Sequence, residues 1–422
     1  MSSSEVAPEA GLTVEQCVAN LESPNPRQRS QAAQELGQLR AQAAVPRLTE
    51  LLRDDVNTYV RSAIAEALGH IGDADAVFPL MDALHDPCSF VRRAAAIALG
   101  QMQAKEAQGA LLQSLDDPNF YVRRAAINAI GKLGVPGLGS MLLPILETSD
   151  PRIRRTAVIA LRRLRNPQSV SRMIEMLEGY LAEPSQRDLP VVKTLVVSLG
   201  ELRTPEAVPV LIRILRGYVG VRSMAAGALG DIGDPDAGPA LMEALNDKSP
   251  NLRLAALKGL GKLGYKPALS VVRDLLGSPD PRMRRMAALT LGHMKDAHSV
   301  AALLKLARTD TSSLVRPAAV EALGMLGDRK LVAELLPLLT DSNAYLRAAL
   351  ARALGKLDGS AEVVQRALKK LTRDEVEHVA LAAQRALNDC EKSTEPALVN
   401  EAECPLPSKK QLSWLKRFLG WS

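Results

Sequence analysis

Apolar and polar positions along the chain alternate with a helical period, and the pattern recurs many times. Between residues 86 and 100, Val91, Ala94, Ala95 and Ala98 follow one another at i, i+3, i+4 and i+7. This spacing predicts a helix with one apolar stripe. A second short helix is expected over 76–84, where Val77, Leu80 and Leu84 repeat at helical spacing after a Gly-Asp turn signal. The two segments together predict a helical hairpin that has to stack on a neighbour to bury its apolar faces.

A column of mostly arginines recurs every 30–32 residues, with one longer step of 38 between the fifth and sixth members. Such a period over many units is typical of a stacked repeat array. We therefore predict an all-α solenoid of about twelve hairpins of ~31 residues each. The column runs through Arg29, Arg61, Arg92, Arg123, Arg154, Val192, Arg222, Arg253, Arg284, Arg316, Arg347 and His378.

A polar residue stands six positions before most members of the arginine column, as Asp86 does before Arg92. Aspartate, serine and threonine are good helix N-caps, so these residues are predicted to cap the helices, with Pro87 and Pro118 in the first helical position. Thr13 and Gln16 form a capping-box pattern at the start of a helix expected over 12–21.

The motifs Asp-x5-Arg, Ala-Ala-x-Ala-Leu-Gly and Gly-Asp-x-x-Ala-Val-x-Pro-Leu resemble the HEAT-like repeat of the phycobilisome-lyase type, over about 21–388. The resemblance implies a helical solenoid, with a right-handed superhelix. It also implies that Asp and Arg form a ladder between neighbouring repeats. It further implies a possible activity, attachment or removal of a bilin on phycobiliproteins. Diiron hydroxylases that share this repeat use His-Glu pairs, and none of the five histidines here is followed by glutamate.

Two further columns form the candidate binding surface. Aromatic residues stand two positions before the arginine column in three successive repeats, and basic residues stand one position after it in four. Columns three residues apart are neighbours on a helix face, so stacking predicts an aromatic stripe beside a basic one. The alternative is that the aromatics fill gaps at helix starts and the cations are solvated. The candidate residues are Tyr59, Phe90 and Tyr121 and, in the basic column, Arg93, Arg124, Arg155 and Lys193.

The repeat pattern is irregular between residues 151 and 220. Residues 151–173 contain seven arginines and no acidic residue, and Arg162 replaces the usual glycine. An insertion around Tyr180 lengthens the following step, and Tyr218 precedes a repeat without a capped start. Irregularity in a regular array is where a site is expected, so Arg162, Tyr180 and Tyr218 join the candidate residues. The alternatives are a solvated charged face and a tolerated loop.

The end of the chain differs in composition. Residues 1–388 are assigned to the solenoid, and 389–408, with three prolines and four glutamates, to a flexible linker. Residues 409–422 predict a cationic amphipathic helix that docks on an anionic membrane or a partner, or else folds back as a cap. Its apolar face comprises Leu412, Trp414, Leu415, Phe418, Leu419 and Trp421.

Composition adds limits to the possible functions. The formal net charge is +6 over 422 residues, which is weak for a nucleic-acid-binding protein, so that partner class is disfavoured. The four cysteines show no paired spacing, so neither a zinc site nor a disulfide framework is indicated. The sequence shows no signal-peptide pattern, long apolar run, catalytic constellation or metal-ligand spacing, and a cytoplasmic protein with peripheral membrane contact is expected.

The leading hypothesis is a non-catalytic scaffold or adaptor that binds a protein partner, needs no cofactor and uses the tail as a second contact. The alternative is a phycobilin lyase or a chaperone-like factor that acts on phycobiliprotein chromophores. In that case the aromatic stripe would stack on a bilin and the arginines would hold its propionates.

Overall fold

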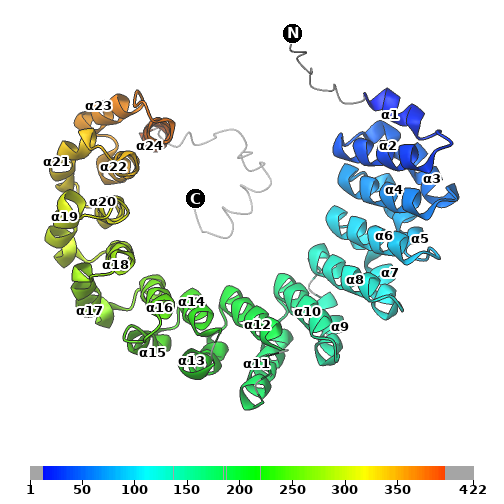
Figure 1. Cartoon of the computed structure of the whole chain (residues 1–422), viewed down its shortest axis with the longest axis horizontal. Helices are drawn as coiled ribbons and strands as arrows, with labels where there is room; N and C mark the ends of the chain where they lie inside the picture. Colours follow the sequence, from blue (N-terminus) through cyan, green and yellow to red (C-terminus); the bar gives the residue numbers. More distant parts are fainter. Residues whose placement is uncertain (1–12, 136, 184, 187, 219, 395–422) are drawn as a thin grey trace, which may run out of the picture. The chain divides into compact units, whose positions relative to one another are not determined.

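The computed structural model describes residues 13–394 except 136, 184, 187 and 219. In these residues it contains helices and no strands, and the helices form twelve successive pairs, as the period predicted. The chain divides into two compact units, residues 1–268 and 269–422. Each unit is a stack of hairpins in which odd-numbered helices form one layer and even-numbered helices the other (Figure 1). The all-α solenoid prediction is confirmed, and the right-handed superhelix stays a prediction.

In the first unit, each even helix packs against the next even helix and against its odd partner. The even helices are α2 (Pro26–Gln38), α4 (Thr58–Ile71), α6 (Ser89–Met102), α8 (Phe120–Leu133), α10 (Pro151–Leu164), α12 (Leu189–Leu202), α14 (Arg222–Ile232) and α16 (Pro250–Leu263). The odd helices are α1 (Val14–Asn20), α3 (Val45–Asp54), α5 (Val77–Ala83), α7 (Gln108–Gln113), α9 (Leu138–Leu142), α11 (Pro167–Ala182), α13 (Val208–Gly217) and α15 (Gly238–Ala244).

The second unit repeats this arrangement. Its even helices are α18 (Pro281–His293), α20 (Val315–Leu326), α22 (Ala344–Asp358) and α24 (Glu377–Thr394), and its odd helices are α17 (Leu269–Asp274), α19 (Val300–Thr309), α21 (Leu331–Leu335) and α23 (Glu362–Leu371). Helix α24 continues past Asn388, where the sequence predicted the repeats to end. No helix in the described part of the chain is long and apolar enough to span a membrane.

Short 3-10 helices connect or extend the odd helices. Several lead directly into an odd helix, as η2 does before α5, and others follow one, as η4 follows α7. They are η1 (Gln42–Ala44), η2 (Ala74–Ala76), η3 (Lys105–Ala107), η4 (Ser114–Asp116), η5 (Leu143–Glu147), η6 (Pro205–Ala207), η7 (Pro235–Ala237), η8 (Lys266–Ala268), η9 (Leu275–Gly277), η10 (Ala297–Ser299) and η11 (Leu336–Thr340).

The core consists of small and aliphatic side chains from both layers. The predicted stripe of α6, Val91, Ala94, Ala95 and Ala98, is fully buried. Glycines near the C-terminal ends of the even helices bring these helices close together. A Cβ at Gly100 would lie 2.7 Å from the Ala129 Cα, a distance that real side chains do not tolerate. Glycine at this column therefore sets a narrow spacing between neighbouring even helices.

The predicted N-caps were wrong, by two residues in most repeats and by four at α20, whose N-cap is Leu314. Helix α4 is capped by Asn57, which accepts hydrogen bonds from its own first turn, and helix α8 is capped in the same way by Asn119. Asp117, predicted as the cap, instead accepts a bond from the Asn119 amide and binds an arginine of the preceding repeat. Pro87 and Pro118 consequently lie before their helices rather than in the first helical position. The capping box of Thr13 and Gln16 is confirmed.

These aspartates and the arginine column form the ladder that the resemblance implied. In each rung the guanidinium of one repeat pairs with the carboxylate of the next. In six of the eight rungs it also donates to a backbone carbonyl six residues earlier, as Arg61 does to Asp55. The rungs are Arg29–Asp55, Arg61–Asp86, Arg92–Asp117, Arg154–Asp188 and Arg222–Asp247 in the first unit, and Arg284–Asp310, Arg316–Asp341 and Arg347–Asp374 in the second.

Candidate functional site

The predicted aromatic column lies on the surface at the N-terminal ends of α4, α6 and α8. Tyr59, Phe90 and Tyr121 are 72%, 55% and 52% exposed. Each is the second residue of its helix, and the Tyr59 and Tyr121 amides donate to the capping asparagines. The rings of Tyr59 and Phe90 stack at a centroid distance of 6.5 Å. The aromatic side chains therefore continue from one repeat to the next.

The predicted basic column runs beside these rings. Arg124, Arg155 and Lys193 are exposed, and Arg93 is half-buried. None of the four forms an ion pair with a carboxylate of the described residues. The Nε of Arg93 is buried and has no hydrogen-bond partner in the described part of the chain. A buried donor without a partner is unfavourable, so this guanidinium is suited to donate to an added anionic group.

The two columns meet in a groove of about 310 Å³ formed by three even helices. Arg93 and Ile97 of α6 line one side, and Tyr121, Arg124, Asn128 and Lys132 of α8 line the other, together with Arg163 of α10. The structure thus brings Arg93, Tyr121 and Arg124 together, as predicted. It adds Asn128, Lys132 and Arg163, which sequence reasoning missed because they lie one or two turns further along their helices.

Arginines also cover the aromatic rings at the α8 end of the row. The guanidinium carbon of Arg124 lies 5.7 Å from the Tyr121 ring centre, and that of Arg152 lies 4.2 Å from the centre of Phe120. Both distances fall in the range of cation–π contacts. Arg152 also binds Asp150, and its hydrogen bond lowers the pKa of that carboxyl to about 2. We call the set Tyr59, Phe90, Tyr121, Arg93, Arg124, Lys132, Arg155, Arg163 and Lys193 the aromatic–basic surface.

The candidate residues of the irregular region lie elsewhere and have internal partners. Arg154 pairs with Asp188 over 2.6 Å, and its guanidinium carbon lies 5.9 Å from the ring centre of Tyr180. Burial raises the pKa of Tyr180 above its ordinary value. Burial and, next, the charge of Asp188 likewise raise the pKa of Tyr218. The inserted segment thus places the Asp188 carboxylate where it can pair with the ladder residue Arg154. Tyr180 and Tyr218 lie close enough to Asp188 to feel its charge.

Arg162, which replaces a glycine, is half-buried between α10 and α12 and pairs with Glu201 over 3.0 Å. The large side chain prevents the close helix contact seen at Gly131, where a Cβ would lie 2.8 Å from Ala160. The apolar residues of the predicted tail helix, Leu412 to Trp421, lie outside the described residues.

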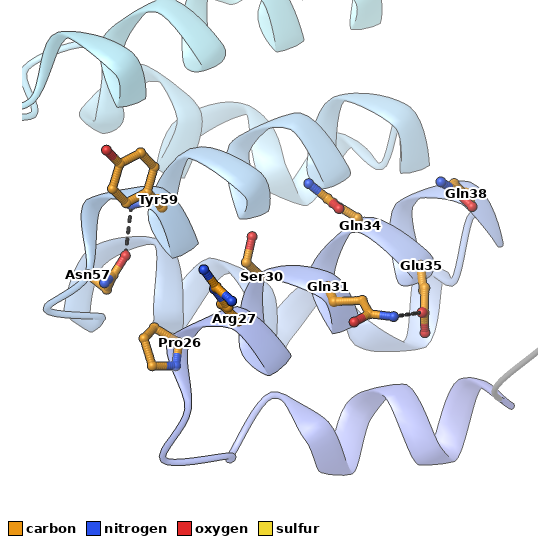
Figure 2. Close-up of a pocket in the computed structure, with 9 residues that line it drawn as sticks. All are labelled: Pro26, Arg27, Ser30, Gln31, Gln34, Glu35, Gln38, Asn57 and Tyr59. Atoms are coloured by element: carbon orange, nitrogen blue, oxygen red, sulfur yellow. Dashed lines mark hydrogen bonds between the residues drawn. The ribbon is translucent and has the colours of Figure 1, made fainter.

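A second, polar groove of about 730 Å³ lies between α2 and α4 and was not predicted (Figure 2). Figure 2 shows Gln31 donating to Glu35, and Asn57 accepting from the Tyr59 amide. The other oxygen of Glu35 accepts from the Cys17 thiol, and burial together with this bond raises the thiol pKa to about 11. Tyr59 is the only member of the aromatic–basic surface that also lines this groove.

The second unit repeats the aromatic position once. Tyr345 is exposed, stands two residues before Arg347, and stacks on His378 at 5.1 Å. Tyr345 was not predicted as a member of the aromatic column, although it stands two residues before Arg347 as Tyr59 stands before Arg61. A groove of about 710 Å³ next to α24 is lined by His378, Arg352, Arg385 and Asp389, among others.

Comparison with solved structures identifies similar folds. Importin beta matches with a TM-score of 0.59 and 15% identity over 89% of this chain and 65% of that one. Kap95p in its complex with RanGDP matches with a TM-score of 0.60 and 13% identity, over 90% of this chain and 61% of that one. The chain therefore spans less than two thirds of these proteins. The CpcE–CpcF phycocyanin lyase of Nostoc matches at 25% identity over 69% of this chain and 98% of that one, with a TM-score of 0.36.

A search of curated proteins gives no match. A family model described as HEAT repeats matches nearly all of the described chain, over residues 14–100, 48–117, 109–184, 181–249, 238–324 and 300–388. The recurring hairpins and the ladder between them agree with this match, and the chain belongs to the family of HEAT repeat proteins.

Proposed function

We propose that this protein is a non-catalytic scaffold whose aromatic–basic surface binds a protein partner. The observation that carries the proposal is the row of exposed rings, Tyr59, Phe90 and Tyr121, beside cations that lack carboxylate partners among the described residues. Aromatic and arginine side chains are the residue types that dominate protein interfaces. Kap95p, which has the same fold, forms complexes with RanGDP and Nup1, so this architecture supports protein binding in that case.

The ladder arginines do not contribute to this surface. Arg92 and Arg61 are mostly buried and engage both oxygens of their aspartates. A paired, buried guanidinium has few donors left for a partner. The basic column, which stands one residue after the ladder arginines and includes Arg93 and Arg124, is the one whose side chains can bind a partner.

The experiment is affinity capture from native lysate with the full-length protein and three variants. Arg124→Glu and Tyr121→Ala change the aromatic–basic surface. Arg285→Glu is the matched control because Arg285 occupies the same helical position in the second unit, is exposed and has no ion pair among the described residues. A partner that is retained by wild type and Arg285→Glu and lost with Arg124→Glu supports the proposal. A partner retained equally by all variants contradicts it.

We keep a second candidate function, that of a phycobilin lyase or chaperone-like factor. Such a factor binds the bilin chromophore of a phycobiliprotein. The observation that favours it is the groove in which the Tyr121 ring lies beside Arg93 and Arg124. A flat tetrapyrrole with two propionates needs a ring face and nearby cations. We also propose that residues 409–422 dock on an anionic membrane surface and so give a cytoplasmic protein a peripheral membrane contact.

A further inference from the structure

Three successive even helices of the first unit, α6, α8 and α10, contain no aspartate or glutamate. On these helices and on α12, six cations of the aromatic–basic surface pair with no carboxylate of the described residues: Arg93, Arg124, Lys132, Arg155, Arg163 and Lys193. An unpaired group of like charges raises the local concentration of the opposite charge. The partner for this surface is therefore acidic.

The cations recur with the spacing of the helices. Arg93, Arg124, Arg155 and Lys193 occupy one position on four successive even helices. Neighbouring packed helices lie about 8–10 Å apart, and the glycine contacts, such as Gly100 against Ala129, keep the α6–α8 and α8–α10 spacings narrow. A segment in the polyproline II conformation advances about 3.1 Å per residue and has three residues per turn, so every third side chain faces the same side. Three residues of such an extended segment thus cover about one helix-to-helix step.

The lining of the groove favours an extended backbone over a helix. Asn128 lies between Arg124 and Lys132 on α8, and no side-chain hydrogen bond of Asn128 occurs within the described residues. Its amide offers two donors and one acceptor carbonyl, which suits a peptide group with a free N–H and C=O. In a helix those groups are already bonded except at the ends. The Nε of Arg93 has no acceptor in the described part of the chain, and a carboxylate side chain of the segment can supply one.

We infer that the aromatic–basic surface binds an extended acidic segment of a partner protein, with a carboxylate at every third residue. Successive carboxylates meet Arg93, Arg124 and Arg155 on the narrowly spaced helices α6, α8 and α10, and Asn128 holds the backbone between them. The inference rests on the proposed function, because it names the chemistry of the partner that the scaffold would bind.

The test measures fluorescence anisotropy of labelled peptides with the full-length protein. One peptide consists of repeated Glu-Ser-Gly units. The second has the same composition, but its glutamates are consecutive. We expect the spaced peptide to bind about tenfold more tightly, since only its carboxylates match the step between helices. Equal affinity of the two peptides would overturn the spacing part of the inference.

Variants of the protein test the surface itself. Arg124→Glu is expected to weaken binding of the spaced peptide by about tenfold or more, because it both removes an attraction and adds a repulsion. Asn128→Ala, which keeps all charges, is expected to weaken binding about threefold through loss of backbone hydrogen bonds. Arg285→Glu changes net charge by the same amount as Arg124→Glu and should leave binding unchanged. If Arg285→Glu weakens binding as much as Arg124→Glu, the peptide is attracted by the net charge of the protein and not by the aromatic–basic surface, and the inference is wrong.

A single-stranded oligouridine is measured in parallel. If it binds more tightly than the spaced peptide and loses affinity with Arg124→Glu, the surface recognises phosphates and the inference fails. If neither peptide binds but a lysate partner is still lost with Arg124→Glu, the inference fails while the proposed function stands. If the lysate partner is retained by Arg124→Glu, the proposed function fails.

Discussion

The guanidinium of Arg92 donates from Nε and Nη2 to both carboxylate oxygens of Asp117, over 2.7 and 3.0 Å. Each partner belongs to a different repeat, and both side chains are mostly buried. The same carboxylate also accepts the Asn119 amide at 2.7 Å. One aspartate therefore joins two hairpins and shapes the turn that precedes its own helix.

Replacing Arg92 tests how much the Arg92–Asp117 ion pair contributes to stability. Arg92→Ala is expected to lower the free energy of unfolding by about 3 kcal/mol, because it leaves the Asp117 carboxylate buried without its counter-charge. Arg123→Ala is the control. Arg123 donates to the Asp117 and Pro118 carbonyls and pairs with no carboxylate among the described residues, so its loss should cost about 1 kcal/mol. Urea unfolding followed by circular dichroism measures both, and equal costs would contradict the role given to the pair.

Thr148 occupies the position relative to Arg123 that Asp117 occupies relative to Arg92. Its carbonyl already accepts from Arg154, as the Asp117 carbonyl accepts from Arg123. Thr148→Asp is expected to complete this rung and to stabilise the protein by about 1 kcal/mol. Thr148→Asn has the same shape without the charge and should give much less. Thermal melting compares them, and a lower melting temperature for Thr148→Asp would refute the expected pairing.

The Arg–Asp ladder makes the folding stability of the protein depend on pH. Hydrogen bonds from Arg284 and Arg347 hold the pKa values of Asp310 and Asp374 below the ordinary range. A depressed pKa means that the unfolded chain binds protons first, so the stabilisation is present above about pH 4 and is lost as the pH falls through the lower folded-state values. We expect the unfolding midpoint in urea to fall steadily below pH 4. Arg284→Met removes the ion-pair partner of Asp310 and should make the urea midpoint fall less steeply below pH 4. If the midpoint falls as steeply as in wild type, the Arg284–Asp310 pair is not a source of the pH dependence.

Binding of a bilin is tested by absorbance. If the groove holds a tetrapyrrole, adding bilin to the protein should give a red-shifted spectrum. The double variant Tyr121→Ala and Arg124→Ala should abolish the shift, because it removes the ring face and one cation from the groove. Absence of any spectral change at micromolar bilin would remove this candidate function.

The tail is tested with liposomes. Six large apolar residues on one face of 409–422 would each contribute roughly 1.5–3 kcal/mol if fully buried, and partial burial at a membrane surface gives much less. Full-length protein is expected to co-sediment with anionic liposomes, helped by the tail's cations. Deleting 409–422 should release it without changing its melting temperature. If the deletion lowers the melting temperature and the intact protein never binds liposomes, the tail is a cap of the solenoid.

The repeat architecture could be predicted because the stripe of Val91, Ala94, Ala95 and Ala98 recurs with a nearly constant period of 30–32 residues, interrupted by one longer step. The caps could not be placed correctly. Asp117 and Asn119 are both good capping residues two positions apart, and only the contact of Asp117 with Arg92 shows which one serves the helix start. That contact joins two repeats, so it depends on how neighbouring hairpins are aligned.

The candidate site was predictable only along one helix at a time. Arg93 and Phe90 lie three residues apart and are neighbours by helical geometry. Lys132 and Arg163 belong to different helices, and their shared groove follows from the close approach of α8 and α10 at Gly131. Tyr345 could have been found from its position two residues before Arg347.

The glycine column determines which repeats could be exchanged. Gly100 requires a small residue, Ala129, in the following hairpin, and Gly131 likewise requires Ala160. A hairpin transplanted into this part of the array would fit if it brings an alanine to meet the glycine before it. At α10 the rule changes, because Arg162 needs an opposite charge such as Glu201 rather than a small contact. The joint between α10 and α12 is therefore specific to its own two repeats, and shuffling of hairpins across it should fail where shuffling before it succeeds.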